Sequence, residues 1–184
     1  MGDKKVYIIT LCGISVAINI VLGIITSTLK APFYLDTLGT VFTAVILGPI
    51  PGAIVGALTN IITGIIYSPK DIPFLLVNVA VALIVGYAAK KFKYNLVTAI
   101  VCGLILSIVC PLIGTPIGIL IYGGLTGTVS DIIVLALKSS GSSIFAASFI
   151  AKIGNNLLDK VGTCLIAYFL ITRLPKSLKN TFNQ

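Results

Sequence analysis

The chain has 184 residues, of which 57% are hydrophobic and only 10% are charged. Soluble domains have about a quarter charged residues, so water cannot be the solvent for most of this surface. Apolar runs close to the roughly 20 residues that a helix needs to cross a bilayer recur along the sequence, without the short alternating segments of a membrane barrel. Composition therefore predicts an all-α membrane protein with a single domain over residues 1–184.

The charge is strongly basic, with 13 Lys and Arg against five acidic residues and no histidine. In a membrane protein such residues gather at helix ends and set the orientation, so we expect no nucleic-acid partner. The four cysteines lie within apolar stretches and lack the spacing of metal ligands. They are expected to be small buried residues, not disulfides or a metal site: Cys12, Cys102, Cys110 and Cys164.

The apolar runs predict six helices in chain order. The first is a retained helix, because it runs well past signal-peptide length without a clear cleavage site. Prolines and glycines in residues 48–52 predict a tight turn, and residues 123–131 are too glycine-rich for a lipid-facing helix. The second and third helices are short, so four spans plus a re-entrant pair is the alternative. The expected helices cover about 6–29, 37–47, 52–67, 72–89, 96 onward with disturbance at 111–116, and 142–174, with a short apolar piece at 132–137.

The basic residues are distributed unevenly between the two sides of the predicted bundle. With the first residues in the cytoplasm, the outer side keeps Lys30, Lys70 and Lys138, each with an aspartate nearby. This asymmetry predicts an even number of crossings, with both termini on the cytoplasmic side of a bacterial plasma membrane. The inner side then carries eight basic residues: Lys4, Lys5, Lys90, Lys91, Lys93, Arg173, Lys176 and Lys179.

The last helix holds the most informative polar group: Lys152, Asn155, Asn156 and Asp159, with Lys160 next. Steps of three, four and seven place the first four along one side of the helix. A charge inside a membrane costs roughly 2.5–3.5 kcal/mol, so these side chains should face a cavity or one another. We predict a polar ligand site here. The alternative is a structural pair of Lys152 with Asp159, together with asparagines that bond neighbouring helices.

Other polar side chains are expected in the same outer half of the bundle. Asp36, Thr37 and Thr40 begin the second helix, where Asp36 is either a ligand group or the N-cap. Asn78 lies inside the fourth helix. Asp131 ends the glycine-rich segment and either contacts the ligand or caps the piece that follows.

Enzyme chemistry finds little support. There is no phosphate-cradling loop, no metal-ligand cluster and no general-base histidine. Ser148 and Lys152 stand four residues apart and could imitate a Ser–Lys nucleophile pair, but the rest of that machinery is missing. We therefore predict that the protein has no catalytic residues, no cofactor and no metal.

Residues on the first and third helices predict contacts with other helices. Gly13 and Ala17 form a small-xxx-small pattern on the first helix, which permits another helix to approach, either inside the bundle or from a separate protein. Asn60 on the third helix is expected to hold helices together by hydrogen bonding.

The order of these motifs resembles the S components of energy-coupling factor (ECF) vitamin transporters, in the riboflavin-type branch. The segments that carry the resemblance are 35–40 (LDTLGT), 48–52 (GPIPG), 56–60 (GALTN), 123–127 (GGLTG) with Asp131, and Asp159-Lys160. The resemblance implies a six-helix bundle with a vitamin pocket near its outer face, closed by the loop after the first helix. It also implies a membrane scaffold (T) subunit and two cytoplasmic ATPase subunits as partners. Gly13 and Ala17 match the Ala-xxx-Ala face that meets the scaffold in the family, with Gly in place of the first Ala.

The resemblance leaves the vitamin open among riboflavin, a vitamin B6 form such as pyridoxal or pyridoxine, and a thiamine-related pyrimidine. Each is a flat heterocycle with polar edges, on which Phe33, Tyr34, Tyr67 and Tyr122 could stack. The modest supply of aromatic residues slightly favours a small vitamin. A self-sufficient secondary transporter is the alternative function, although no inverted repeat is detectable.

Overall fold

The computed structural model describes residues 2–31, 33–125 and 130–175. Within these ranges the chain forms seven α-helices, one 3-10 helix and no β-strand, which confirms the predicted all-α class. The elements are α1 (Gly2–Thr28), α2 (Leu38–Ile46), α3 (Pro49–Ile66), η1 (Pro69–Phe74), α4 (Leu75–Phe92), α5 (Leu96–Tyr122), α6 (Ser130–Ser139) and α7 (Ile144–Arg173).

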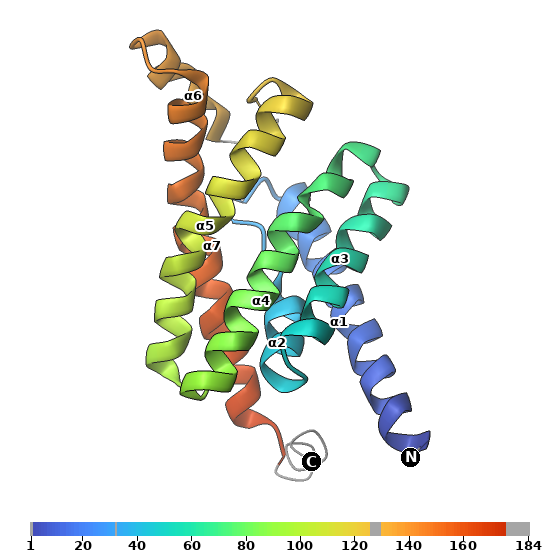
Figure 1. Ribbon diagram of the computed structural model, residues 1–184. Coiled ribbons are helices and arrows are strands. Elements are labelled where there is room, and N and C mark those ends of the chain that lie inside the picture. The colour runs from blue at the N-terminus through green and yellow to red at the C-terminus, as the bar shows by residue number, and fades with distance from the viewer. Residues whose placement is uncertain (1, 32, 126–129, 176–184) are drawn as a thin grey trace.

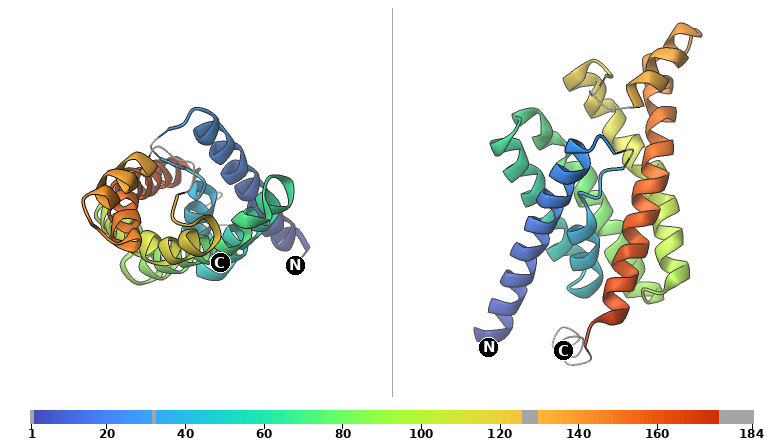
Figure 2. Two further views of the ribbon diagram at one scale, coloured as in Figure 1. Left: turned by 90° about the horizontal axis from the view of Figure 1, so that it is seen from above. Right: turned by 180° about the vertical axis from the view of Figure 1, so that it is seen from behind.

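The long helices run side by side, and the beginning of α1 lies at the same end of the bundle as the last turn of α7 (Figures 1 and 2). The short helix α2 contacts α1, α3, α4 and α7. α5 packs along α7, and α6 packs against α7 at the opposite end of the molecule. α2 therefore lies among the other helices, whereas α6 lies at the end of the bundle away from the first residues of α1 (Figure 1).

Within the described residues, four helical segments are long and apolar enough to cross a membrane: Lys5–Thr28, Pro49–Ile66, Pro69–Phe92 and Leu96–Tyr122. Their outward side chains are largely exposed and apolar, as expected of a surface in contact with lipid; Ile65 is 73% exposed and Leu120 is 86% exposed. α2 has nine residues, too few to span by itself. The count of six crossings and the orientation with both termini inside stay predictions.

Prolines begin one helix and lie inside another, where the sequence predicted a turn and a disturbance. The prediction of a turn over residues 48–52 was wrong beyond Gly48, because α3 begins at Pro49. Proline suits the first helical turn, where its missing N–H needs no partner, and Gly48 precedes it with φ of 103°. α5 continues through Pro111 and Pro116 to Tyr122. Neighbouring helices can support such positions within a bundle.

The glycine-rich segment begins where α5 ends. Gly123 and Gly124 both have positive φ, 68° and 94°, and the Gly123 N–H bonds to the carbonyl of Ile119. Glycine adopts this left-handed conformation without a steric penalty and so ends the helix. Residues 126–129 lie outside the described part of the chain. The predicted apolar piece at 132–137 is the centre of α6.

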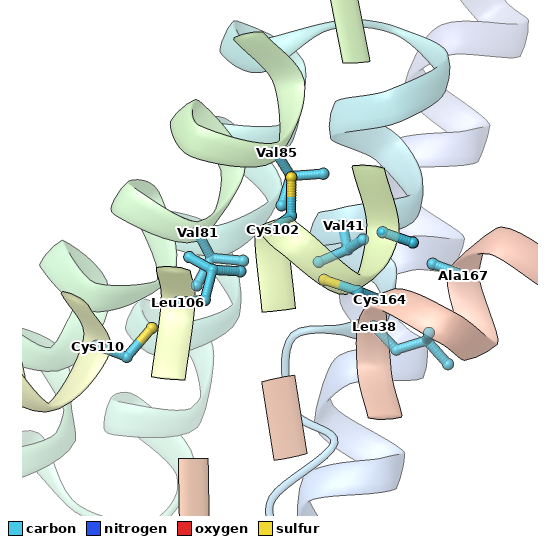
Figure 3. Close-up of a cluster of buried hydrophobic side chains, with 10 residues drawn as sticks. Leu38, Val41, Val81, Val85, Cys102, Leu106, Cys110, Cys164 and Ala167 are labelled. Carbon is cyan, nitrogen blue, oxygen red and sulfur yellow. The ribbon is translucent and has the colours of Figure 1, made fainter. Parts of the chain in front are cut away.

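The apolar core lies where α2, α4, α5 and α7 meet (Figure 3). It includes Val41, Val85 and Leu106, all 0% exposed. Cys102, Cys110 and Cys164 belong to this cluster, and all four cysteines are free, as predicted; Cys12 is only partly buried. The core thus joins the short helix α2 to α4, α5 and α7.

Glycines set the closest helix approaches. A Cβ on Gly39 would overlap the backbone of Ser15, where α2 crosses α1, and a Cβ on Gly103 would come within 2.6 Å of the Val161 backbone, between α5 and α7. Because a methyl group does not fit at either crossing, these positions require glycine at the present helix spacing.

Candidate ligand-binding site

A cavity of about 560 Å³ lies between the helices, and on α1 it is lined by the second half of the helix, from Asn19 to Thr28. Side chains of α1, α3, η1, α4, α5, α7 and the loop after α1 line it. A volume in this range is typical of sites for small organic ligands. Its amide and aromatic lining side chains are Asn19, Asn60, Asn78, Asn156, Tyr34, Tyr67, Phe74 and Tyr122.

The face that α7 presents to the cavity carries Lys152, Asn156 and Lys160, which are spaced by four residues. This spacing keeps side chains on one face of a helix. The prediction placed Asn155 and Asp159 on this face as well, but neither is among the lining residues. Asn155 is half-buried and lies next to Tyr34, while Asp159 is completely buried. The cavity face therefore keeps Lys152 and Asn156 of the predicted set and has Lys160 in place of Asn155 and Asp159.

The Asp159 carboxylate holds the loop that follows α1. Its Oδ1 atom accepts hydrogen bonds from the backbone N–H groups of Tyr34 at 2.9 Å and Leu35 at 2.7 Å. Its Oδ2 atom lies 2.6 Å from the Lys160 ammonium, so Asp159 pairs with Lys160 and not with Lys152. Backbone donors and an ion pair occupy both oxygens. Asp159 thus fixes one wall of the cavity without lining it.

The Lys160 ammonium continues this arrangement toward the start of α2. It donates a hydrogen bond to Thr37 Oγ1 at 3.0 Å and lies 3.6 Å from Asp36 Oδ1. Thr37, not Asp36, is the N-cap residue of α2, so the N-cap interpretation of Asp36 was wrong. Asp36 and Thr37 both line the cavity. Lys160 was not among the predicted site residues, although its spacing of four from Asn156 is the signal that could have found it.

The Lys152 ammonium is held less tightly. It donates a hydrogen bond to the backbone carbonyl of Gly114 at 3.3 Å and lies within electrostatic range of Asp131. Asp131 is in the first turn of α6 and does not line the cavity. Ser148 donates its hydroxyl hydrogen to the Gly124 carbonyl, at 3.2 Å. Ser148 and Lys152 therefore bond to separate carbonyl groups and are not arranged as a nucleophile with its base.

Aromatic side chains form the rim of the cavity around η1 and the end of α5. The Tyr122 hydroxyl donates to Asp71 Oδ1 at 2.9 Å, and the Lys70 ammonium lies 5.5 Å from the Tyr122 ring centroid. Phe74 lies 6.4 Å from Tyr122, measured between ring centroids. Of the four predicted stacking residues, Tyr34, Tyr67 and Tyr122 line the cavity, whereas Phe33 does not. Phe74 was missed.

Residues 3–176 match the family described as ECF-type riboflavin transporter, S component. This match covers nearly the whole chain, in agreement with the resemblance seen in the sequence motifs. The chain belongs to this family. It is accordingly a transport protein of the membrane that acts by binding, not an enzyme. Searches of curated proteins and of solved structures each found no match.

A row of buried polar side chains forms the floor of the cavity in this S component. Asn78, on α4, lines the cavity, while Thr40 is 0% exposed and lies beneath it. Asn60, which was expected to hold helices together by hydrogen bonding, both lines the cavity and accepts a hydrogen bond from Asn78. Asn19 was missed altogether. The signal was present, because a lone amide in the long apolar run of α1 calls for a polar partner.

The predicted partner face of the S component lies on the outside of α1. Gly13 and Ala17 are both exposed, and a Cβ built on Gly13 would meet no atom within 4 Å. The small-xxx-small surface is therefore not used for packing inside the bundle.

Proposed function

We propose that this S component is the high-affinity binding subunit of an ECF-type ABC importer, and that its cavity holds a flat heterocyclic vitamin, riboflavin in the first place. The single observation that carries this proposal is the cavity, which combines aromatic rims with amide side chains in a chain of this family. Aromatic rings suit a flat ring system, while amides satisfy its polar edge. The family description names riboflavin, which favours it over vitamin B6 forms.

The proposed partners are a membrane scaffold subunit, which contacts Gly13 and Ala17, and two ATPase subunits on the cytoplasmic side of a bacterial plasma membrane. The exposure of both small residues supports this docking, because a helix can approach closely only where side chains are small. The sequence has no phosphate-cradling loop of its own, which fits a separate source of ATP hydrolysis.

Riboflavin binding by the purified chain tests the substrate. Titration should quench the flavin fluorescence saturably, with one molecule bound per chain, because the ring would stack on the tyrosines that line the cavity. Native mass spectrometry should detect the same molecule if it co-purifies. The exposed variant Gly13→Ala serves as the matched control and should bind like the wild type. Binding of pyridoxal or pyridoxine without binding of riboflavin would reassign the substrate.

Transport separates the S component from a secondary transporter. Liposomes that contain the chain together with scaffold and ATPase subunits should take up the vitamin only when ATP is supplied. Ion-driven uptake by the chain alone would contradict the proposal and favour the alternative function.

A further inference from the structure

Four side chains from four helices form a continuous hydrogen-bonded row along the floor of the cavity. Asn19 on α1 bonds to Thr40 on α2 at 2.9 Å, Thr40 bonds to Asn78 on α4 at 2.8 Å, and Asn78 bonds to Asn60 on α3 at 3.0 Å. Asn19 and Thr40 are 0% exposed, and Asn78 is 4% exposed. Asn19, Asn78 and Asn60 line the cavity and Thr40 lies beneath it, so the row runs along the cavity floor.

The backbone fixes the direction of the first bond in this row. The two ends of an asparagine amide have nearly the same shape, so its orientation follows from its partners. The backbone N–H of Gly39 lies 2.7 Å from Asn19 Oδ1 and can only donate. The oxygen of Asn19 must therefore face Gly39, and its nitrogen donates to the hydroxyl oxygens of Thr40, at 2.9 Å, and Thr59, at 3.0 Å.

The direction of the first hydrogen bond determines the direction of each following bond in the row. Thr40 has one hydroxyl hydrogen, and with Asn19 as its donor it gives that hydrogen to Asn78 Oδ1 at 2.8 Å. The Asn78 nitrogen then faces Asn60 Oδ1, at 3.0 Å, and the Asn60 nitrogen is left at the far end. Its bond to the Asp71 carbonyl is long, at 3.5 Å. The uncommitted hydrogens at the cavity surface thus belong to the amide N–H groups of Asn78 and Asn60, whereas each amide oxygen already accepts one hydrogen bond.

We infer that this row sets the floor of the cavity to donate hydrogen bonds, so that the ligand must present an acceptor edge, with carbonyl oxygens or unprotonated ring nitrogens, to α3 and α4. Asn19, at the opposite end of the row from Asn60, is the positioning residue that determines this polarity through Thr40. This inference rests on the proposed function, in which the cavity holds a heterocyclic vitamin. It adds to that function the hydrogen-bonding character of the edge that is recognised and the residue that selects it.

Two substitutions of Asn60 test the polarity, with riboflavin as the probe at about pH 8. Asn60→Ala removes the donor and should lower riboflavin affinity about tenfold. Asn60→Asp is nearly the same size as asparagine but offers only acceptors, so it should lower the affinity further than alanine does. An aspartate variant that binds riboflavin as tightly as the alanine variant, or more tightly, would overturn the inference. Thermal melts of the ligand-free variants confirm that both are folded.

Asn19→Asp tests the positioning role. Aspartate would accept hydrogen bonds from the hydroxyl groups of Thr40 and Thr59. The amide groups of Asn78 and Asn60 would then exchange the positions of their oxygen and nitrogen atoms, and the Asn60 oxygen would face the cavity. Riboflavin affinity should fall at least tenfold, and most of that loss should vanish in an Asn60→Ala background, because Asn19 acts through Asn60. Equal losses in both backgrounds would mean that Asn19 does not act through the row. If Asn19→Asp does not fold, the two Asn60 variants still decide the polarity.

A ligand-free measurement separates this inference from the proposed function. If the wild-type chain does not bind riboflavin, the substrate assignment fails, and side-chain hydrogen exchange in ¹⁵N-asparagine-labelled protein still decides the polarity of the row. The amide hydrogens of Asn19 should exchange slowly, because both are bonded, and at least one of those of Asn60 should exchange rapidly. Rapid exchange at Asn19 together with full protection at Asn60 would reverse the assigned direction.

Discussion

At the scale of single residues, Lys152 and Lys160 of α7 both line the cavity, but their ammonium groups have different neighbours. Lys160 is 4% exposed and lies against Asp159, Asp36 and Thr37. The Lys152 ammonium donates a hydrogen bond to the Gly114 carbonyl at 3.3 Å. We therefore expect Lys160 to stabilise the fold and Lys152 to be more available to a ligand.

Lys160→Met should destabilise the ligand-free protein by about 3–5 kcal/mol, because it leaves the Asp159 carboxylate buried without its cation. Adding Asp159→Asn should restore much of this loss, since the amide oxygen can still accept from the backbone N–H groups of Tyr34 and Leu35. Lys152→Met is the matched control on the same helix. It should leave the melting temperature nearly unchanged and weaken riboflavin binding by one or two factors of ten, about 1.4–2.8 kcal/mol. Thermal melts and calorimetric titration of all three variants check this; a Lys160→Met protein that melts like the wild type would contradict it.

At the scale of helices, the crossing of α1 and α2 depends on a missing side chain. Gly39→Ala would place a methyl group on the Ser15 backbone, so the helices must separate or shift. Such overpacking costs about 1–3 kcal/mol, and the melting temperature should fall accordingly. Gly13→Ala, on the same helix pair but in open space, should leave it unchanged. Equal melting temperatures for the two variants would show that the crossing adapts freely.

The outer face of α1 carries the second prediction at this scale. Replacing Gly13 and Ala17 together by leucine fills the surface where the scaffold is proposed to dock. Uptake in the reconstituted complex should be abolished, while riboflavin affinity of the isolated chain stays within a few-fold of the wild type. Loss of affinity would instead show that these positions support the binding site.

At the scale of the whole molecule, the basic residues predict both termini in the cytoplasm. The start of α1 and the last turn of α7 do lie at one end of the bundle (Figure 1), as an even number of crossings requires. Single cysteines at Lys4, Lys70, Lys93 and Gln184, in a protein without its own four cysteines, can be labelled from outside intact cells. Only position 70 should react. Outside labelling at position 184 would contradict the even count.

The sequence by itself determined the class of this protein. A composition with 57% hydrophobic and 10% charged residues permits long apolar helices and little else, and the ordered motifs identified the family. It also located α7 as the polar helix, because charges within a membrane helix are costly and need a reason. Such properties depend on local sequence and on the solvent, so no tertiary contact is required to recognise them.

Only the tertiary structure decided which polar groups meet. Asp159 bonds to the backbone of Tyr34 and Leu35, more than 120 residues away in the chain, and so became a support for the loop and not a lining residue. Asn19 obtained its orientation from a backbone N–H on another helix. The spacing along one helix places side chains on a common face of that helix. The neighbouring helices decide what that face contacts. The same reason explains why α7 presents Lys160 to the cavity in place of Asn155 and Asp159.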